Sequence, residues 1–187
     1  MWNSMKRKRS VRNRRARRCL FLILLALLAL LLIWPRTVHL EGLVSPYAIL
    51  VDADSGEAVA EKKADVSIYP ASMTKVMTAL LALEANPDLE QPVTLPEDIF
   101  PELRAEGASM AGFQPGETAT VRDLLYGALL PSGAECCEAL AREVSGSEEA
   151  FVELMNQKAA ELGMRSTHFC NPTGLHDPEH VSTVRDM

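Results

Sequence analysis

The chain has 187 residues, which is enough for one domain of ordinary size and too few for two. Its formal net charge of −6 hides a split, because the first 18 residues carry nine of the 19 Lys and Arg residues and no Asp or Glu. The rest of the chain therefore sets ten basic residues against 25 acidic ones. Such a basic arm could bind nucleic acid, but sixteen apolar residues come directly after it, so we expect it to lie at a membrane and to bind no nucleic acid.

The apolar segment, residues 19–34, is predicted to be a transmembrane signal anchor. Sixteen helical residues rise about 24 Å, and flanking arginines can snorkel to span a hydrocarbon core of about 30 Å. Trp34–Val38 contains no small-x-small cleavage site, which favours an uncleaved anchor over a removed signal peptide. Because basic residues stay on the cytoplasmic side, residues 1–18 are predicted to be a cytoplasmic arm. The domain beyond a linker at residues 35–45 is then extracytoplasmic, held at the cell membrane by a single span.

Residues 46–187 are predicted to form one α+β domain. Residues 47–52 and 58–61 have strand composition and flank a turn, which predicts an antiparallel hairpin. An apolar helical stretch then begins around Ser72 and ends where Asn86-Pro87 stops it.

The second half of the domain is predicted to be mostly helical. Residues 87–119 are rich in Pro and Gly and are predicted to be a loop-dominated excursion. Capping signals and apolar stripes then predict three helices, at residues 121–130, 134–144 and 148–162. A further capping box at Thr183–Asp186 should open another helix, so we expect the domain to be C-terminally truncated in this chain.

Ser72 and Lys75 form a Ser-x-x-Lys motif at the start of the first predicted helix. Residues at i and i+3 share a helical face, so the hydroxyl and the amine can come within hydrogen-bond reach. The positive end of the helix dipole favours an anion near Ser72 and lowers the pKa of a nearby ammonium. A serine hydroxyl needs such an activating neighbour to act as a nucleophile, which predicts acyl-transfer chemistry. Ser132, on the break between two predicted helices, could present a second hydroxyl to the same cleft.

Several segments, taken in order, resemble the serine D-alanyl-D-alanine carboxypeptidases, which are the low-molecular-mass penicillin-binding proteins. The resemblance covers roughly residues 45–187. It rests on Ile49–Glu57, Pro70–Thr78, Val121–Gly127, Leu130–Gly133 and Asn171–His176.

The resemblance implies a penicillin-binding-protein or β-lactamase-like fold, with a helical subdomain and an antiparallel sheet that is incomplete here. It makes Ser72 the acyl-ester nucleophile, Lys75 its proton acceptor and Ser132 the relay of a proton to the leaving D-alanine. The Ser72 N–H would supply one half of an oxyanion hole. The implied substrate is a peptidoglycan stem peptide ending in D-Ala-D-Ala, with β-lactams as acylating inhibitors and no cofactor.

Two departures from the family pattern leave other functions open. Ala134 stands where the family has Asn, and no Lys-Thr-Gly motif is found later in the chain. We therefore expect the chain by itself not to be a competent enzyme. The alternatives are a β-lactamase-like serine hydrolase and a non-catalytic, membrane-tethered module that binds peptidoglycan or β-lactams.

The remaining reactive residues are assigned structural roles. Cys136 and Cys137 are expected to be buried thiols, although Cys170 could pair with one of them. His176 and His180 are four residues apart, but Pro178 between them argues against a helix that presents both to zinc, so no metal site is predicted. Glu153 lies mid-helix and is not expected to be a deacylating glutamate.

Overall fold

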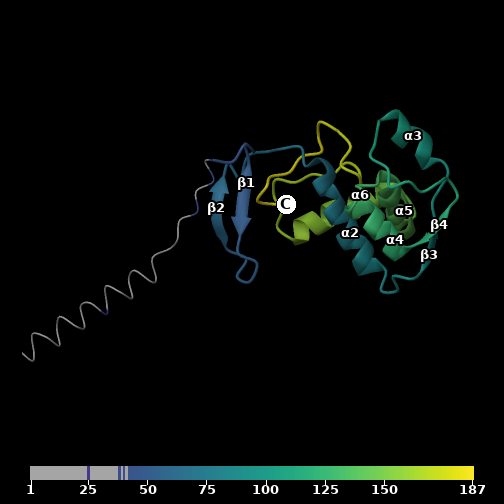
Figure 1. Ribbon diagram of the computed structural model, residues 1–187, viewed down its shortest axis with the longest axis horizontal. Coiled ribbons are helices and arrows are strands. Elements are labelled where there is room, and N and C mark those ends of the chain that lie inside the picture. The colour runs from purple at the N-terminus through teal and green to yellow at the C-terminus, as the bar shows by residue number, and fades with distance from the viewer. Residues whose placement is uncertain (1–24, 26–37, 39, 41) are drawn as a thin grey trace, which may run out of the picture. The chain divides into compact units, whose positions relative to one another are not determined.

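The computed structural model describes residues 25, 38, 40 and 42–187. The chain divides into two compact units, Met1–His39 and Leu40–Met187, and all the helices and strands named in Figure 1 belong to the second. The predicted arm and anchor therefore lie outside the described residues, apart from residue 25. None of the helices in the described part of the chain is long and apolar enough to cross a bilayer.

The predicted hairpin is present (Figure 1). Strands β1 (Ala48–Val51) and β2 (Ala58–Lys62) pair antiparallel, with Ala48 opposite Lys62 and a bulge at Leu50/Val51. The side chains of the pair are mostly exposed or half-buried, so the hairpin contributes little to the core. An isolated two-stranded hairpin is marginal in water, and contacts with other segments are needed to stabilise it.

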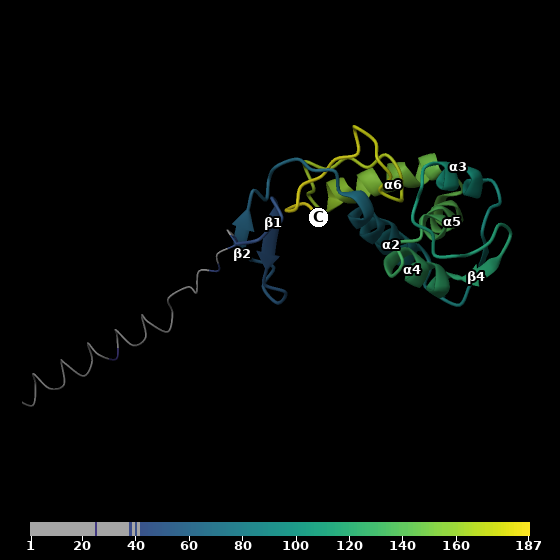
Figure 2. The same ribbon diagram turned by 45° about the horizontal axis from the view of Figure 1, so that its top comes forward.

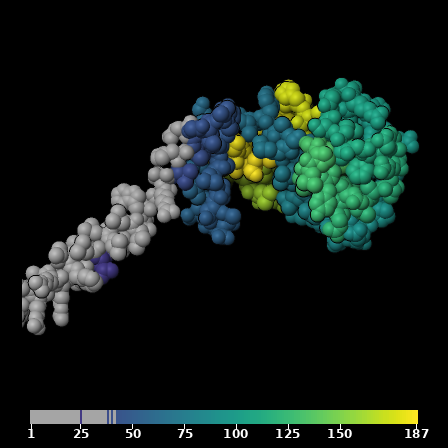
Figure 3. Space-filling model, viewed as in Figure 1, coloured from purple at the N-terminus to yellow at the C-terminus, as the bar shows by residue number. Residues whose placement is uncertain are grey.

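The C-terminal segment supplies such contacts. The Arg185 guanidinium donates to the carboxylates of Glu61 on β2 and Asp65 just after it. Ile68 and Ser182 exchange backbone hydrogen bonds of 2.8 and 2.9 Å, forming an isolated antiparallel bridge. In Figure 3 the last residues, in yellow, lie beside the hairpin, in blue.

Four helices build the body that positions the site (Figures 1 and 2): α2 (Thr74–Ala85), α4 (Val121–Leu129), α5 (Ala134–Ser145) and α6 (Glu148–Glu161). Helix α5 packs against α2, α4 and α6, and all residues from 134 to 141 are buried. A helix that is buried on every face is typical of the centre of a domain. The outer face of α2 differs, because Val76 and Leu83 are 59% and 48% exposed.

The prediction of a loop-dominated excursion over residues 87–119 was wrong in part. This stretch contains β3 (Pro92–Thr94) and α3 (Ile99–Ala105), and β4 (Thr118–Thr120) at its end pairs antiparallel with β3. The elements are too short to give a clear hydrophobic period. Pro101 argued against a helix but lies in the first turn of α3, where backbone N–H groups have no partner within the helix.

The predicted helix boundaries are confirmed where capping side chains mark them. The Thr120 hydroxyl accepts a hydrogen bond from Asp123 N, and the Asp123 carboxylate accepts one from Thr120 N, which completes a capping box for α4. Ser147 caps α6 through Ala150 N.

The capping box predicted at Thr183–Asp186 is only half formed. Asp186 N donates to the Thr183 hydroxyl, but the Asp186 carboxylate instead accepts from Ser166 N and the Thr167 hydroxyl.

Candidate active site

Ser72 and Lys75 are brought together as the motif predicts. Ser72 lies on a 3₁₀ turn, η1 (Ala71–Met73), that leads directly into α2, and Lys75 lies in the first turn of α2. The Lys75 Nζ donates to the Ser72 Oγ over 3.2 Å. The sequence predicted an i, i+3 pair within one α-helix, whereas the pair spans the junction between the 3₁₀ turn and α2. Ser72 is exposed, whereas Lys75 is only 5% exposed.

Ser132 joins the pair from the break between α4 and α5. Its hydroxyl donates to the Ser72 Oγ over 2.9 Å, although the two residues are 60 positions apart in sequence. The backbone of Ser132 has a φ of 66°, which is uncommon outside glycine and costs on the order of 1–3 kcal/mol. Packing fixes this conformation, because Gly133 N donates to Gly127 O and a Cβ on Gly133 would lie 2.7 Å from the Ala111 Cβ. The break therefore holds Ser132 against Ser72.

The environment of Lys75 favours its neutral form. Burial lowers the pKa of Lys75, and this effect is opposed by Cys137 and Glu135 on α5. Burial also raises the pKa of Cys137 to about 12, so the thiol is uncharged near neutral pH. The Lys75 Nζ also donates to the backbone oxygen of Thr173 over 2.5 Å. The amine is therefore held by two oxygens, one from Ser72 and one from Thr173.

The segment that carries Thr173 was not predicted to contact the site. The Asn171 Oδ1 accepts from Thr173 N, the Thr173 hydroxyl and Gly174 N, which closes a tight turn. A second contact joins the segment to α2, where the Thr78 hydroxyl donates to Pro172 O over 2.6 Å. Asn171–His176 is one of the segments on which the family resemblance rests, so the sequence did mark this turn. None of its side chains was expected to take part in catalysis, and a contact with Lys75 was therefore not predicted.

Gly174 lets this turn lie against the Ala71–Ser72 backbone for a steric reason. Its φ is +80°, and a Cβ at this position would overlap the carbonyl group of Ala71, the residue before Ser72. Ala71 itself has a φ of 49°, so the turn that carries Ser72 is strained at this residue. Only glycine lets the two backbones approach this closely.

The histidines take structural roles in the described part of the chain. Cys170 N donates to the His180 Nδ1, so the proton of the neutral ring is on Nε2, which lies 2.8 Å from the buried Thr74 hydroxyl. Burial lowers the pKa of His180, which favours this neutral form. His176 packs edge-on against Tyr69. Among the residues that the structure describes, no three His, Cys, Asp or Glu side chains are grouped so that they could hold a metal ion.

The remaining predicted residues have these positions. Cys136 and Cys137 are buried free thiols, as predicted, and Cys170 is a half-buried free thiol. Glu153 is exposed on α6. Ala134, the position of the family's Asn, is buried at the start of α5 and its N–H donates to Ser109 O over 2.8 Å.

Comparison with known proteins supports the motif resemblance. Residues 36–187 match the profile of a family described as D-alanyl-D-alanine carboxypeptidase. The chain is similar to the D-alanyl-D-alanine carboxypeptidase DacF of Bacillus subtilis, with 39% identity over 140 residues. That match covers 75% of this chain and 36% of the relative, so the chain spans little more than a third of the relative's length.

Solved structures give the same result for the fold. The D-alanyl-D-alanine carboxypeptidase DacD from Francisella tularensis superposes with a TM-score of 0.71 and 34% identity, covering 82% of this chain and 37% of that one. Penicillin-binding protein 5 from Haemophilus influenzae superposes with a TM-score of 0.72 and 31% identity, covering 80% of this chain and 44% of that one. Both similarities extend over most of this chain and over less than half of the longer relative.

Proposed function

Because the chain belongs to the D-alanyl-D-alanine carboxypeptidase family, we propose that it carries the nucleophile of a serine-type enzyme that removes the terminal D-alanine from peptidoglycan stem peptides. The observation that carries the proposal is the convergence of Lys75 and Ser132 on the Ser72 Oγ. Two polar groups on one hydroxyl match the needs of acyl transfer, in which one group must take the proton and another must return it.

The first step forms an ester. Neutral Lys75 takes the proton of the Ser72 hydroxyl, and the Oγ bonds to the carbonyl carbon of the penultimate D-alanine. The carbonyl oxygen becomes an oxyanion, for which the Ser72 N–H supplies one donor. Such a donor typically contributes a few kcal/mol of transition-state stabilisation.

The second step expels D-alanine and frees the enzyme. The carbon–nitrogen bond breaks, and the leaving amine takes the proton that Lys75 accepted, relayed through the Ser132 hydroxyl. Water then attacks the ester carbon while Lys75 accepts a proton from it. The bond between that carbon and the Ser72 Oγ breaks, Lys75 returns the proton to the Oγ, and the shortened peptide leaves. The stem peptide is the substrate and no cofactor takes part.

We also propose that the protein is held at the cell membrane by residues 19–34. The support is the sequence alone, namely sixteen apolar residues between a basic arm and a chain with a strong acidic excess. This topology places Ser72 outside the cytoplasm, where peptidoglycan is.

The proposal is tested by acylation of the protein expressed from its complete gene. Intact-protein mass spectrometry should show one benzylpenicilloyl adduct on the wild type and none on Ser72→Ala. The control, Ser109→Ala, alters an exposed serine near Ala134 and should be acylated at the wild-type rate. A D-alanine release assay on a D-Ala-D-Ala peptide completes the test.

The alternatives give different results in the same two assays. A β-lactamase would lose the adduct within seconds and release penicilloate in many turnovers. A non-catalytic binding module, for which Ala134 is the supporting residue, would release no D-alanine. An adduct that survives on Ser72→Ala would show that Ser72 is not the nucleophile.

A further inference from the structure

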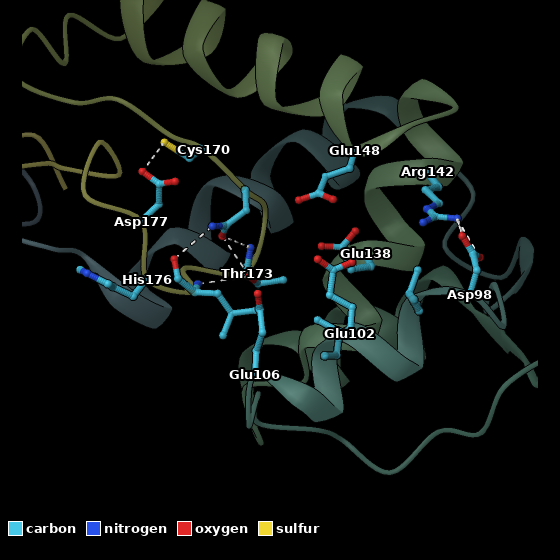
Figure 4. A pocket seen from close by; sticks show the side chains of 14 residues that line it. Asp98, Glu102, Glu106, Glu138, Arg142, Glu148, Cys170, Thr173, His176 and Asp177 are labelled. Atoms are coloured by element: carbon cyan, nitrogen blue, oxygen red, sulfur yellow. Dashed lines mark hydrogen bonds and ion pairs between the residues drawn. The ribbon is translucent and has the colours of Figure 1, made fainter.

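A cavity of about 300 Å³ lies between α3, α5, the start of α6 and the segment from Cys170 to Asp177 (Figure 4). Neither Ser72 nor Lys75 lines it. Its lining is rich in carboxylates: Asp98, Glu102, Glu106, Glu138, Glu148 and Asp177. The Arg142 guanidinium also lines the cavity, but it is engaged in two hydrogen bonds, of 2.9 and 2.8 Å, with the carboxylate of Asp98. The lining contains five further carboxylates and no further Lys or Arg side chain.

Glu138 is the carboxylate that points to a ligand. It is only 5% exposed, and within the part of the chain that the structure describes its side chain makes no hydrogen bond or ion pair. A buried charged group normally has a partner, because burial without one costs several kcal/mol or forces the group to become neutral. Figure 4 shows Glu138 beside Glu102 and Glu148, which reach the same space from α3 and α6.

We propose that this cavity binds an aliphatic ammonium group, with Glu138 as its main partner and Glu102 and Glu148 completing the site. The volume lies at the lower end of the range of small-molecule pockets, about 300–1,000 Å³, and exceeds the space that one bare ion fills. An ammonium group offers three N–H donors to separate carboxylates. A metal ion needs several ligands converging within about 2.6 Å, and the described carboxylates are not grouped in that way.

The ligand would lie next to the segment that holds the proposed catalytic lysine. Thr173 lines the cavity, and its backbone oxygen accepts the hydrogen bond from Lys75. The ammonium could come from a free diamine or from a diamino-acid residue of a peptide, which present the same chemistry to the cavity. The proposal does not depend on the proposed peptidase activity, because it concerns binding at residues outside the reaction centre.

Isothermal titration calorimetry on the whole protein in detergent tests the binding. The probes are 1,5-diaminopentane and the methylamide of Nα-acetyl-lysine, which separate a free diamine from a single peptide-borne ammonium. Tetramethylammonium at the same ionic strength is the control ligand, because it carries the charge but has no N–H donor. We expect saturable binding of at least one ammonium probe and none of tetramethylammonium.

Two variants locate the site. Glu138→Gln keeps the shape of the side chain and should weaken binding by about tenfold or more, since it removes the buried charge that pairs with the ligand. Glu102→Gln alters an exposed residue, so it tests the cavity without endangering the fold, and should weaken binding severalfold. Glu153→Gln makes the same charge change on the exposed face of α6, outside the cavity, and should leave the affinity unchanged.

The affinity should also depend on pH in a defined direction. Burial, followed by the charges of Glu148, Glu102 and Glu149, raises the pKa of Glu138 to about 8, while Arg142 acts in the opposite direction. Glu138 is therefore mainly protonated at pH 6, and ammonium binding must release that proton. Affinity should increase from pH 6 to pH 8.5, where the amine is still charged.

Three results would overturn the proposal. The first is that neither ammonium probe binds, even at ten times the protein concentration and above. The second is that tetramethylammonium binds with the same affinity as the ammonium probes. The third is that Glu138→Gln and Glu102→Gln both keep the wild-type affinity. Saturable binding of Ca²⁺ that excludes the ammonium probes would also contradict it, because the site would then be a metal site.

Discussion

At the scale of the residue, the proposed mechanism makes the activation of Ser72 depend on the charge state of Lys75. A positioned base typically contributes about 10²–10⁴-fold to a rate, so Lys75→Met should slow acylation of Ser72 by benzylpenicillin by that factor. In the wild type, the acylation rate should rise with pH as Lys75 loses its proton. Because burial lowers the pKa of Lys75, the midpoint of this rise should lie below the ordinary lysine value of 10.5. Stopped-flow measurement of acylation from pH 5 to 10 checks both expectations.

A second lysine provides the control. Lys158→Met removes a charge that pairs with Glu84 and Glu161 on the surface, and should leave both the rate and its pH profile unchanged. A Lys75→Met protein that keeps the wild-type rate and the same rise with pH would show that another group accepts the proton.

The three residues of the candidate site were predictable because each contributes a side chain in a recognisable spacing. Ser72 and Lys75 are three residues apart, and Ser132 comes after a proline at a helix break. Thr173 was not predictable in this way, since it contributes a backbone oxygen from 98 residues away and any residue type could supply it. Glu135 was not predictable for a different reason, since its side-chain Oε1 accepts hydrogen bonds from Ala111 N and Gly112 N, which lie more than 20 residues earlier, and thereby fixes the loop beside Gly133.

At the scale of the element, the turn from Asn171 to Leu175 supports the 3₁₀ turn that carries Ser72. Gly174→Ala should displace this support, because the new Cβ would overlap the Ala71 carbonyl. A shift of about 1 Å at a reacting group can cost on the order of 10²-fold in rate, and we expect a loss of that size in acylation of Ser72. Labelling with a fluorescent penicillin over time measures the loss.

Gly163→Ala is the matched control for that prediction. Gly163 has nearly the same backbone conformation, with a φ of +78°, but no atom lies within 4 Å of where its Cβ would be. Both variants should lose about 1 kcal/mol of folding free energy from the left-handed backbone, and Gly174→Ala should lose more. If the two variants are acylated equally fast, the turn does not position the nucleophile.

Most elements were predictable from their local signals, and the exceptions share a cause. The hairpin, α4, α5 and α6 have turn residues, caps or apolar stripes that mark their limits. The missed strands β3 and β4 are three residues long, and α3 has seven residues. Such elements are stabilised by tertiary packing, here the burial of Val93, Phe100 and Leu103 in the core around α5, which no local pattern reveals.

At the scale of the whole molecule, the helices and small antiparallel sheets superpose on part of solved penicillin-binding proteins, in line with the motif resemblance. Composition alone did not indicate it. The order of several short motifs along the chain was informative, and three of them, Pro70–Thr78, Val121–Gly127 and Leu130–Gly133, lie at a helix start or a break between helices in the same body. The charged residues are distributed unevenly along the chain, because the basic residues are concentrated before the apolar segment and the acidic residues lie after it.

This division leads to a prediction about processing. The protein should be retained in the membrane with residues 19–34 intact, because no small-x-small site comes after the apolar segment. Sequencing the N-terminus of protein isolated from the membrane fraction should give a start before residue 19. A start between residues 36 and 45 would show that the segment is a cleaved signal peptide.

A designed variant tests the same prediction by adding the cleavage site that the wild type lacks. Replacing Arg36 and Val38 together by alanine creates an Ala-x-Ala sequence directly after the apolar segment, and removes one positive charge from its outer side. Signal peptidases cleave after such small residues, so the doubly substituted protein should lose the segment and move to the soluble extracytoplasmic fraction. The wild type should stay in the membrane in the same preparation. If both proteins stay there with the same N-terminus, sequence at the cleavage position does not decide retention, and the length of the apolar segment is the better explanation.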